Sequence, residues 1–332
     1  MRHVLRRAAA AGPALAALIA VASCAPPAPR ITDGADPAGT SAAVTADTPY
    51  DIRPLLAPHH KYLGIALDGT PTQEAPVRDF TTQAGKQPNL REYYAKWGDP
   101  FLAYNNRTVW DRGQLPFLVW EPYSSTAGQI AAGKDDAYIR TFADAVRDYN
   151  RPLALSFGHE MNGDWYPWGS QKTSAADFAR AWRHIHDLFT DEGAANVIWV
   201  WSPNVINPVP GVRLQPYYPG NAYVDWIGIV GYYAHTGPTT FSTVFGPTLK
   251  EIRRFSRKPF LVAETGVQAG DRKPAEIADL FRGVASRADM LGLVWFNIKK
   301  EADWRINSGP ASLAAFRRAA ARDSFGFDVR KP

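Results

Sequence analysis

Cysteine is almost absent from this sequence. The 332 residues include a single one, Cys24, so the chain cannot form an internal disulfide. A GxGxxG run and a phosphate-binding P-loop are also missing, and no second histidine follows His159-Glu160 at the spacing of a zinc-protease helix. These absences argue against a nucleotide-binding doubly wound sheet and against a zinc site. We therefore expect no cofactor and no metal.

Much of the excess positive charge lies at the N-terminus. The formal net charge is +5, and Arg2, Arg6 and Arg7 precede Cys24 without an acidic neighbour. Taking these three from the 37 basic residues leaves 34 against 32 acidic ones, a net charge of +2. Because the remaining chain has no dense basic cluster, we expect no nucleic-acid partner. The 11 tryptophans are the unusual feature, and they indicate either a bulky core or exposed platforms for sugar rings.

The first 23 residues resemble an export signal of the lipoprotein type. A basic stretch precedes an apolar run over residues 8–22, which is too short to span a membrane comfortably, and the run ends in Val-Ala-Ser-Cys24. We expect lipidated Cys24 to anchor the protein at the extracellular face of the cell membrane; secretion with an incidental cysteine is the alternative. Residues 24–58, rich in Pro, Ala, Gly and Thr, are expected to form a disordered tether, and residues 59–332 the folded domain.

Eight short apolar runs, each ending in a polar or glycine-marked turn, divide this domain. Such runs are typical of parallel strands buried on both faces. Several are separated by segments with apolar residues three and four apart, at 135–149, 174–189, 274–285 and 311–321. Eight such units over about 270 residues predict an α/β fold, a (β/α)8 TIM barrel with one catalytic domain. The predicted strands are 61–69, 89–98, 115–123, 151–160, 196–204, 224–233, 259–266 and 291–299.

A TIM barrel has its functional residues at the carboxyl ends of the strands. Glu160 would end the fourth strand and Glu264 the seventh, so their carboxyl groups would face each other across the barrel mouth. A protonated and an ionised carboxyl beside aromatic rings suit cleavage of a glycosidic bond; two unrelated glutamates in salt bridges are the alternative. The predicted strand ends carry Asp68, Trp97, Trp120-Glu121, His159-Glu160, Trp201, Asn204, Tyr232-Tyr233, Glu264, Trp295 and Asn297.

Several motifs in this order resemble glycoside hydrolase family 26, a family of retaining (β/α)8 glycosidases. The resemblance covers roughly residues 60–320. It includes the strand of Glu264 and the sequences His159-Glu-Met-Asn-Gly-Asp-Trp165, Asn196-Val-Ile-Trp-Val-Trp-Ser-Pro-Asn204, Trp295-Phe-Asn297 and Asp303-Trp-Arg305.

The resemblance implies a role for each matching residue. Glu160 would be the general acid/base and Glu264 the nucleophile. Tyr232 would hydrogen-bond the nucleophile, although Tyr233 stands beside it, and His159 would bind substrate or orient the neighbouring carboxylate. The other substrate-binding candidates are Trp165 and Trp295, which resemble rings at the cleavage point, and Trp120 and Glu121, expected on the glycone side.

The family resemblance implies a retaining endo-β-glycanase with a polysaccharide substrate, and we expect a monomer. Its best-known members cleave β-mannan, so β-1,4-mannan is the expected substrate, with mixed-linkage β-1,3-1,4-glucan and β-1,3-xylan as alternatives. Ser156-Phe157-Gly158 stands where mannanases tend to have an arginine, and Tyr166-Pro167-Trp168 is closer to the glucan-cleaving members. A polysaccharide-binding lipoprotein without activity is the competing class, but such a protein would be expected to have lost one carboxylate.

Overall fold

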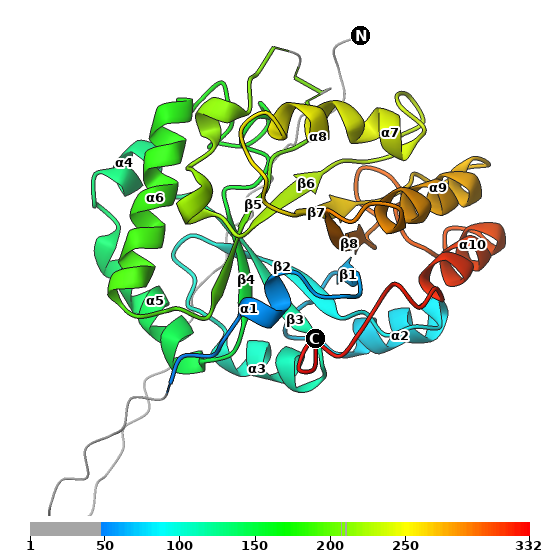
Figure 1. Cartoon of the computed structure of the whole chain (residues 1–332), viewed down its shortest axis with the longest axis horizontal. Helices are drawn as coiled ribbons and strands as arrows, with labels where there is room; N and C mark the ends of the chain where they lie inside the picture. The colour runs from blue at the N-terminus through cyan, green and yellow to red at the C-terminus, as the bar shows by residue number, and fades with distance from the viewer. Residues whose placement is uncertain (1–47, 207, 210) are drawn as a thin grey trace, which may run out of the picture. The chain divides into compact units, whose positions relative to one another are not determined.

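The computed structural model describes residues 48–206, 208–209 and 211–332. The expected signal segment 1–23, Cys24 and most of the expected tether lie outside these residues. Eight parallel strands form one closed barrel in the order β1 to β8, with helices around it (Figure 1), which confirms the predicted TIM barrel. Within the described ranges, none of the helices combines the length and the apolar character needed to cross a lipid bilayer.

Each strand pairs with its neighbours in sequence, and β1 and β8 close the ring. Every strand lies inside its predicted run except β8, which begins one residue earlier. The strands are β1 (Tyr62–Ala66), β2 (Leu90–Lys96), β3 (Leu115–Glu121), β4 (Leu153–Phe157), β5 (Val197–Trp201), β6 (Trp226–Val230), β7 (Phe260–Thr265) and β8 (Met290–Phe296).

The four predicted helices are present as α5 (Asp136–Tyr149), α6 (Ala175–Asp191), α9 (Lys273–Ala285) and α10 (Pro310–Ala320). Helix α6 begins where the sequence indicates, because the Ser174 hydroxyl accepts the Asp177 N–H at 3.0 Å. The remaining helices are α1 (Arg53–Leu56), α2 (Ala75–Ala84), α3 (Ala103–Asp111), α4 (Ala127–Ala131), α7 (Phe241–Val244), α8 (Gly246–Ile252) and the 3-10 segments η1 (Gln215–Tyr217) and η2 (Asn221–Tyr223).

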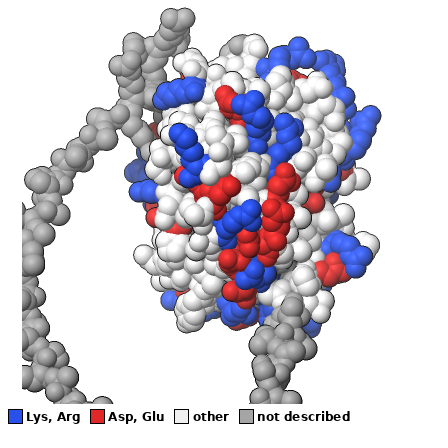
Figure 2. Space-filling view, turned by 90° about the vertical axis from the view of Figure 1, so that its left-hand side faces the viewer, with Lys and Arg blue, Asp and Glu red and all other residues white. Residues whose placement is uncertain are grey.

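The outer surface over α5 and α6 carries both signs of charge side by side (Figure 2). Arg140 on α5 pairs with Glu192 just after α6, and Arg147 pairs with Asp144 one turn earlier at 2.6 Å. The first pair connects two neighbouring helices, whereas the second lies within one helix and is solvent-exposed. Exposed pairs of this kind contribute little to stability, so the helix layer depends on the apolar contacts beneath it.

The folded unit begins at Thr48, earlier than the predicted start at His59. Helix α1 buries Leu55, whose carbonyl accepts the Tyr62 hydroxyl at 2.9 Å. The indole N–H of Trp226 donates to the Leu56 carbonyl at 3.0 Å. Tyr62 and Trp226 are the first residues of β1 and β6, so this segment covers the amino-terminal end of the barrel. Residues 48–58 therefore belong to the domain and not to the tether.

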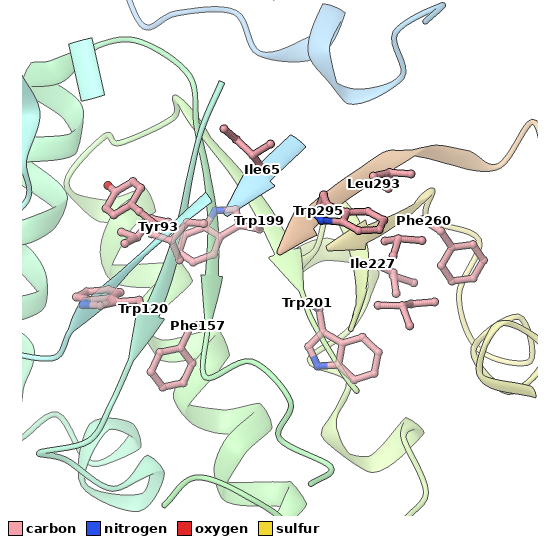
Figure 3. Packing of buried hydrophobic residues seen from close by; sticks show 14 of the residues in the cluster. Ile65, Tyr93, Trp120, Phe157, Trp199, Trp201, Ile227, Phe260, Leu293 and Trp295 are labelled. Carbon is pink, nitrogen blue, oxygen red and sulfur yellow. The ribbon is translucent and has the colours of Figure 1, made fainter. Parts of the chain in front are cut away.

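Two apolar layers result from the alternation of side chains along each strand. The inner cluster takes residues from all eight strands, among them Val294 and Phe296 of β8. The outer cluster joins the opposite side of the strands to the surrounding helices and includes Leu293 and Trp295. Figure 3 shows part of this outer layer.

Two predicted substrate-binding residues, Trp120 and Trp295, belong to the outer layer (Figure 3). Both are 0% exposed. Trp120 stacks on Phe142 of α5 with ring centroids 4.3 Å apart, and Trp295 packs edge-on against Phe316 of α10 at 5.1 Å. The prediction for both was wrong, because position at a strand end does not decide which side of the strand a side chain takes.

We expect Trp120→Ala to lower the free energy of unfolding by about 3–5 kcal/mol, because it leaves a cavity between β3 and α5. Denaturant unfolding would measure this loss. The KM of the folded variant should stay within about twofold of wild type, which corresponds to a change of less than about 0.5 kcal/mol in the binding free energy. A large rise in KM without a loss of stability would contradict this placement and indicate that Trp120 binds substrate.

Candidate active site

Glu160 and Glu264 lie together at the mouth of the barrel. Glu160 follows β4 and Glu264 lies near the end of β7. Both residues are buried, with 7% and 8% of their surface exposed. β4 and β7 are three strands apart in the closed ring, so their carboxyl ends face each other. The charge of Glu264 raises the pKa of Glu160, which shows that the two groups share one site.

Glu160 has an unusual backbone, with a φ of 55° in the left-handed region that favours glycine. Its N–H donates to the Ser202 carbonyl at 2.7 Å, and its own carbonyl accepts the Gly163 N–H at 2.9 Å. Such conformations cluster at functional sites, where surrounding hydrogen bonds hold them. The turn after β4 is therefore fixed from both sides at the residue that carries the carboxyl group.

Two N–H donors hold the Glu160 carboxyl group. The Trp165 indole donates to Oε2 at 2.8 Å, and the Asn204 amide donates to Oε1. Asn204 is fixed in turn by Asn162, whose amide donates to the Asn204 carbonyl at 2.8 Å and accepts the Asn204 N–H at 2.9 Å. The motif that begins at His159 and the one that ends at Asn204 thus meet at this carboxyl group.

Only glycine fits at position 163, because the Trp165 ring packs directly against its backbone. A Cβ atom at this position would lie 2.5 Å from the Trp165 ring, far inside van der Waals contact. The close approach lets the indole turn back toward Glu160. Trp165 is half-buried and stands at the predicted place, next to the acid/base candidate.

Two tyrosines hold the Glu264 carboxyl group. Tyr232, just after β6, donates its hydroxyl proton to Oε1, as predicted, and Tyr94 on β2 donates to Oε2. The neighbouring Tyr233 belongs to the outer layer, where it donates to Asp279 at 3.3 Å, so the ambiguity between the two is resolved. Sequence reasoning missed Tyr94, although its place two residues after Glu92 on one strand indicates that both face inward.

The surroundings of the two carboxyl groups separate their protonation. Burial, followed by the charge of Glu264, raises the pKa of Glu160 to about 8. Burial also raises the pKa of Glu264, but the hydroxyls of Tyr232 and Tyr94 counteract it by donating to the charged form. Glu160 therefore holds its proton more strongly than Glu264, an order that fits the roles of acid and nucleophile.

His159 and Tyr166 form a wall of the site beside the acid/base candidate, and His159 is neutral. Burial lowers its pKa to about 3, with a further contribution from the charge of Lys300. Its Nε2 atom lies 3.2 Å from the Tyr166 hydroxyl, and its carbonyl accepts the Trp168 indole N–H at 2.6 Å. Trp168 is 2% exposed and stacks on Tyr166 at 4.5 Å, so it supports this wall from behind.

Glu121 ends β3 on the side of the barrel interior, since it alternates with Trp120 of the outer layer. Burial and the charges of Glu160, Glu264 and Glu121 raise the pKa of the Tyr166 hydroxyl, which places Glu121 beside the same wall. The structure therefore separates a predicted pair, with Glu121 at the mouth and Trp120 in the helix layer.

Two further residues at the mouth were missed. Trp304, in the loop after β8, is half-buried and lies 4.7 Å from the Tyr232 ring, where Trp295 had been expected to contribute. Glu92 on β2 is a third carboxyl group below the mouth, 2% exposed. Burial and the charges of Glu264 and Glu160 raise its pKa well above the usual range, which favours its neutral form. Glu92 lies in mid-strand, so the position of functional residues at strand ends did not predict it.

A closed (β/α)8 barrel with two buried glutamates of unequal pKa at its mouth has the fold and the acid–nucleophile pair of a glycoside hydrolase. The chain belongs to glycosyl hydrolase family 26. The model of that family matches residues 123–250. Over 270 residues the chain is 32% identical to Endoglucanase H of Acetivibrio thermocellus, which covers 77% of this chain and 30% of the relative.

Shorter matches connect the chain to relatives with other names. It is 34% identical over 123 residues to mannan endo-1,4-beta-mannosidase A and B of Caldalkalibacillus mannanilyticus, covering 35% of this chain and 21% of the relative. It is 29% identical over 101 residues to beta-1,3-xylanase TXYA of a Vibrio species, covering 30% and 21%. The chain thus spans less than a third of the length of these relatives.

Solved structures support the fold. The chain matches a β-mannanase of this family from Bacteroides ovatus with a TM-score of 0.60 and 16% identity, over 82% of this chain and 92% of the other. It matches a modular endo-beta-1,4-mannanase from Cellulomonas fimi with a TM-score of 0.63 and 16% identity, over 81% and 72%.

The donors on each carboxyl group predict changes in different limbs of the pH profile of kcat/KM. Tyr94→Phe removes a donor from ionised Glu264 and should move the acidic limb to higher pH, whereas Asn204→Ala removes one from Glu160 and should move the alkaline limb to higher pH. Each should reduce the rate at the optimum by roughly 10- to 100-fold, the size of a hydrogen bond to a charged group. Each variant is the control for the other, and a shift of the same limb by both would contradict the assignment.

Proposed function

We propose that the chain is a retaining endo-β-glycanase. The observation that carries this proposal is the unequal environment of the two glutamates: burial beside Glu264 raises the pKa of Glu160 to about 8, whereas two tyrosine hydroxyls donate to Glu264 and favour its charged form. The named relatives, which are a glucanase, mannosidases and xylanases, support the same class.

The geometry accounts for both steps of a double displacement. Glu160 gives its proton to the leaving oxygen while Glu264 attacks the anomeric carbon and forms a glycosyl-enzyme. The covalent bond removes the negative charge of Glu264, which is the second cause of the raised pKa of Glu160. The pKa of Glu160 therefore falls in the intermediate, and the same carboxylate can accept a proton from the attacking water.

We infer that β-glucan, including mixed-linkage β-1,3-1,4-glucan, is the first substrate to test, ahead of the β-1,4-mannan expected from the sequence. The relative named endoglucanase matches 77% of this chain, whereas those named mannosidase match 32% to 54%. Ser156, near the position where mannanases tend to have an arginine, is buried and donates to the Ser202 hydroxyl at 2.8 Å. That side of the site thus offers no cation at residue 156.

We also propose that the protein is an exported lipoprotein with Cys24 acylated. The basic and apolar segments before Cys24 and the Pro- and Ala-rich stretch after it support this proposal. Such an anchor would place the barrel at the extracellular face of the membrane, where polysaccharide is available. Globomycin treatment of cells, followed by gel mobility of the protein, would distinguish acylation from simple secretion.

Loss of either catalytic carboxyl group should abolish most hydrolysis. We expect Glu160→Gln and Glu264→Gln each to lower kcat on the best substrate by at least roughly 100-fold, the smaller end of general acid–base contributions. The measurement is release of reducing ends from β-glucan, mannan and β-1,3-xylan in parallel, and proton NMR of the first product should show the β-anomer.

Glu92→Gln is the matched control for these variants. It makes the same chemical change on a buried carboxyl group in the same site, but burial already favours the neutral form of Glu92, and the proposed mechanism gives it no step. We expect it to keep activity within about tenfold of wild type, since only one neutral group replaces another. Near-normal turnover by Glu160→Gln or Glu264→Gln, or an α-anomeric first product, would contradict the proposed mechanism.

A further inference from the structure

A buried lysine stands beside the active-site loop that follows β8. Lys273, the first residue of α9, is 0% exposed. Its Nζ atom donates to the Arg305 carbonyl at 2.8 Å, lies 3.5 Å from the Asp303 carbonyl, and is 5.7 Å from the centre of the Trp295 ring. Lysines are almost never fully buried unless their ammonium group is paired. Here the partners are backbone carbonyls, which suggests that the lysine serves to hold this part of the backbone.

The carbonyls that Lys273 contacts are those on either side of Trp304. The carbonyl of Trp304 itself accepts the Trp295 indole N–H at 3.0 Å, and that of Asp303 also accepts the Ala269 N–H at 3.0 Å. Three consecutive carbonyls are thus held by groups from β8, from the connection between β7 and α9, and from α9. The loop is fixed through its backbone, which leaves the Trp304 side chain free to face the mouth.

Trp304 in turn packs against the group that holds the nucleophile. Its ring lies 4.7 Å from the Tyr232 ring, and Tyr232 donates to Glu264. A Cβ atom added at Gly266, two residues after Glu264, would lie 3.1 Å from the Trp304 Cβ and 3.4 Å from the Tyr232 ring. Trp304, Tyr232 and the backbone beside the nucleophile are therefore in mutual contact, and a shift of the loop would move Tyr232.

We propose that Lys273 is a positioning residue for the nucleophile: its ammonium group holds the backbone on both sides of Trp304, and Trp304 keeps Tyr232 against Glu264. This inference rests on the proposed hydrolase function, because it concerns the same site. Lys273 does not touch the reacting atoms. It acts through two intermediate side chains, so its effect should appear in the titration of Glu264.

Lys61 offers a matched control. It contacts the first residue of β8, whereas Lys273 contacts the loop that follows the last. Its Nζ atom also donates to two backbone carbonyls, those of Arg287 and Met290, and Met290 is the first residue of β8. Lys61→Met and Lys273→Met therefore remove the same kind of interaction, one far from the mouth and one beside it. Both variants should lose stability in thermal unfolding, so stability alone does not distinguish the two positions.

We expect Lys273→Met, but not Lys61→Met, to move the acidic limb of kcat/KM to higher pH, because a displaced Tyr232 no longer favours ionised Glu264. The kcat should fall about tenfold, the effect of one weakened hydrogen bond to a charged group, and Lys273→Arg should restore part of it. The acidic limb is the informative one, since burial lowers the pKa of Lys273 only to about 8 and the lysine remains charged throughout that limb.

Amide hydrogen exchange tests the same inference without any substrate. Peptides covering residues 298–306 should exchange faster in Lys273→Met than in wild type or Lys61→Met. A folded Lys273→Met with wild-type protection of this loop and a wild-type acidic limb would overturn the inference while leaving the hydrolase intact. If wild type cleaved none of the glycans, the proposed function would fail, and the exchange result alone would still decide whether Lys273 holds the loop.

Discussion

The repulsion between Glu160 and Glu264 across a buried mouth is the interaction on which the site depends. Two carboxyl groups that share a site poor in water cannot both be ionised at neutral pH without a large cost, so the surrounding groups decide which one keeps its proton. Tyr232 and Tyr94 donate to both oxygens of Glu264. Glu160 also accepts two N–H donors, but it is held in a left-handed turn and buried next to that charge, which together with burial raises its pKa to about 8. The chemistry of a glycosidase follows from this asymmetry, and neither glutamate would have it alone.

Closure of the barrel brings the two glutamates together, and the order of elements was readable from the sequence because most of the strands are short apolar runs. The mouth was also readable in part: Glu160, Glu264, Tyr232 and Trp165 occupy their predicted places. Trp120 and Trp295 did not, because a strand end specifies one end of the barrel but not one side of the strand. The register that decides the side depends on pairing between strands, and β8 shifts its register against β7.

The roles of residues deeper in the barrel were not predicted from the sequence, for a related reason. Tyr94 and Glu92 lie within β2, in a run that reads as an ordinary amphipathic strand, and only closure brings them beneath Glu264. Trp304 lies in a loop whose path is set by backbone contacts with Lys273, Trp295 and Ala269. Contacts between segments distant in sequence leave no periodicity, so motif spacing could indicate the chemistry of the site but not its supports.

Most of the tryptophans fill the apolar layers, and two of the buried ones also support the mouth. Nine of the 11 tryptophans are buried, and the two that are half-buried, Trp165 and Trp304, both stand at the mouth. Among the buried ones, Trp168 donates its indole N–H to the His159 carbonyl and Trp295 donates to the Trp304 carbonyl. A buried indole fills the space between barrel and helices and still needs a partner for its N–H, and here the partner is the backbone of a mouth residue. These two rings, which look like part of a sugar-binding wall in the sequence, therefore hold the residues that form one.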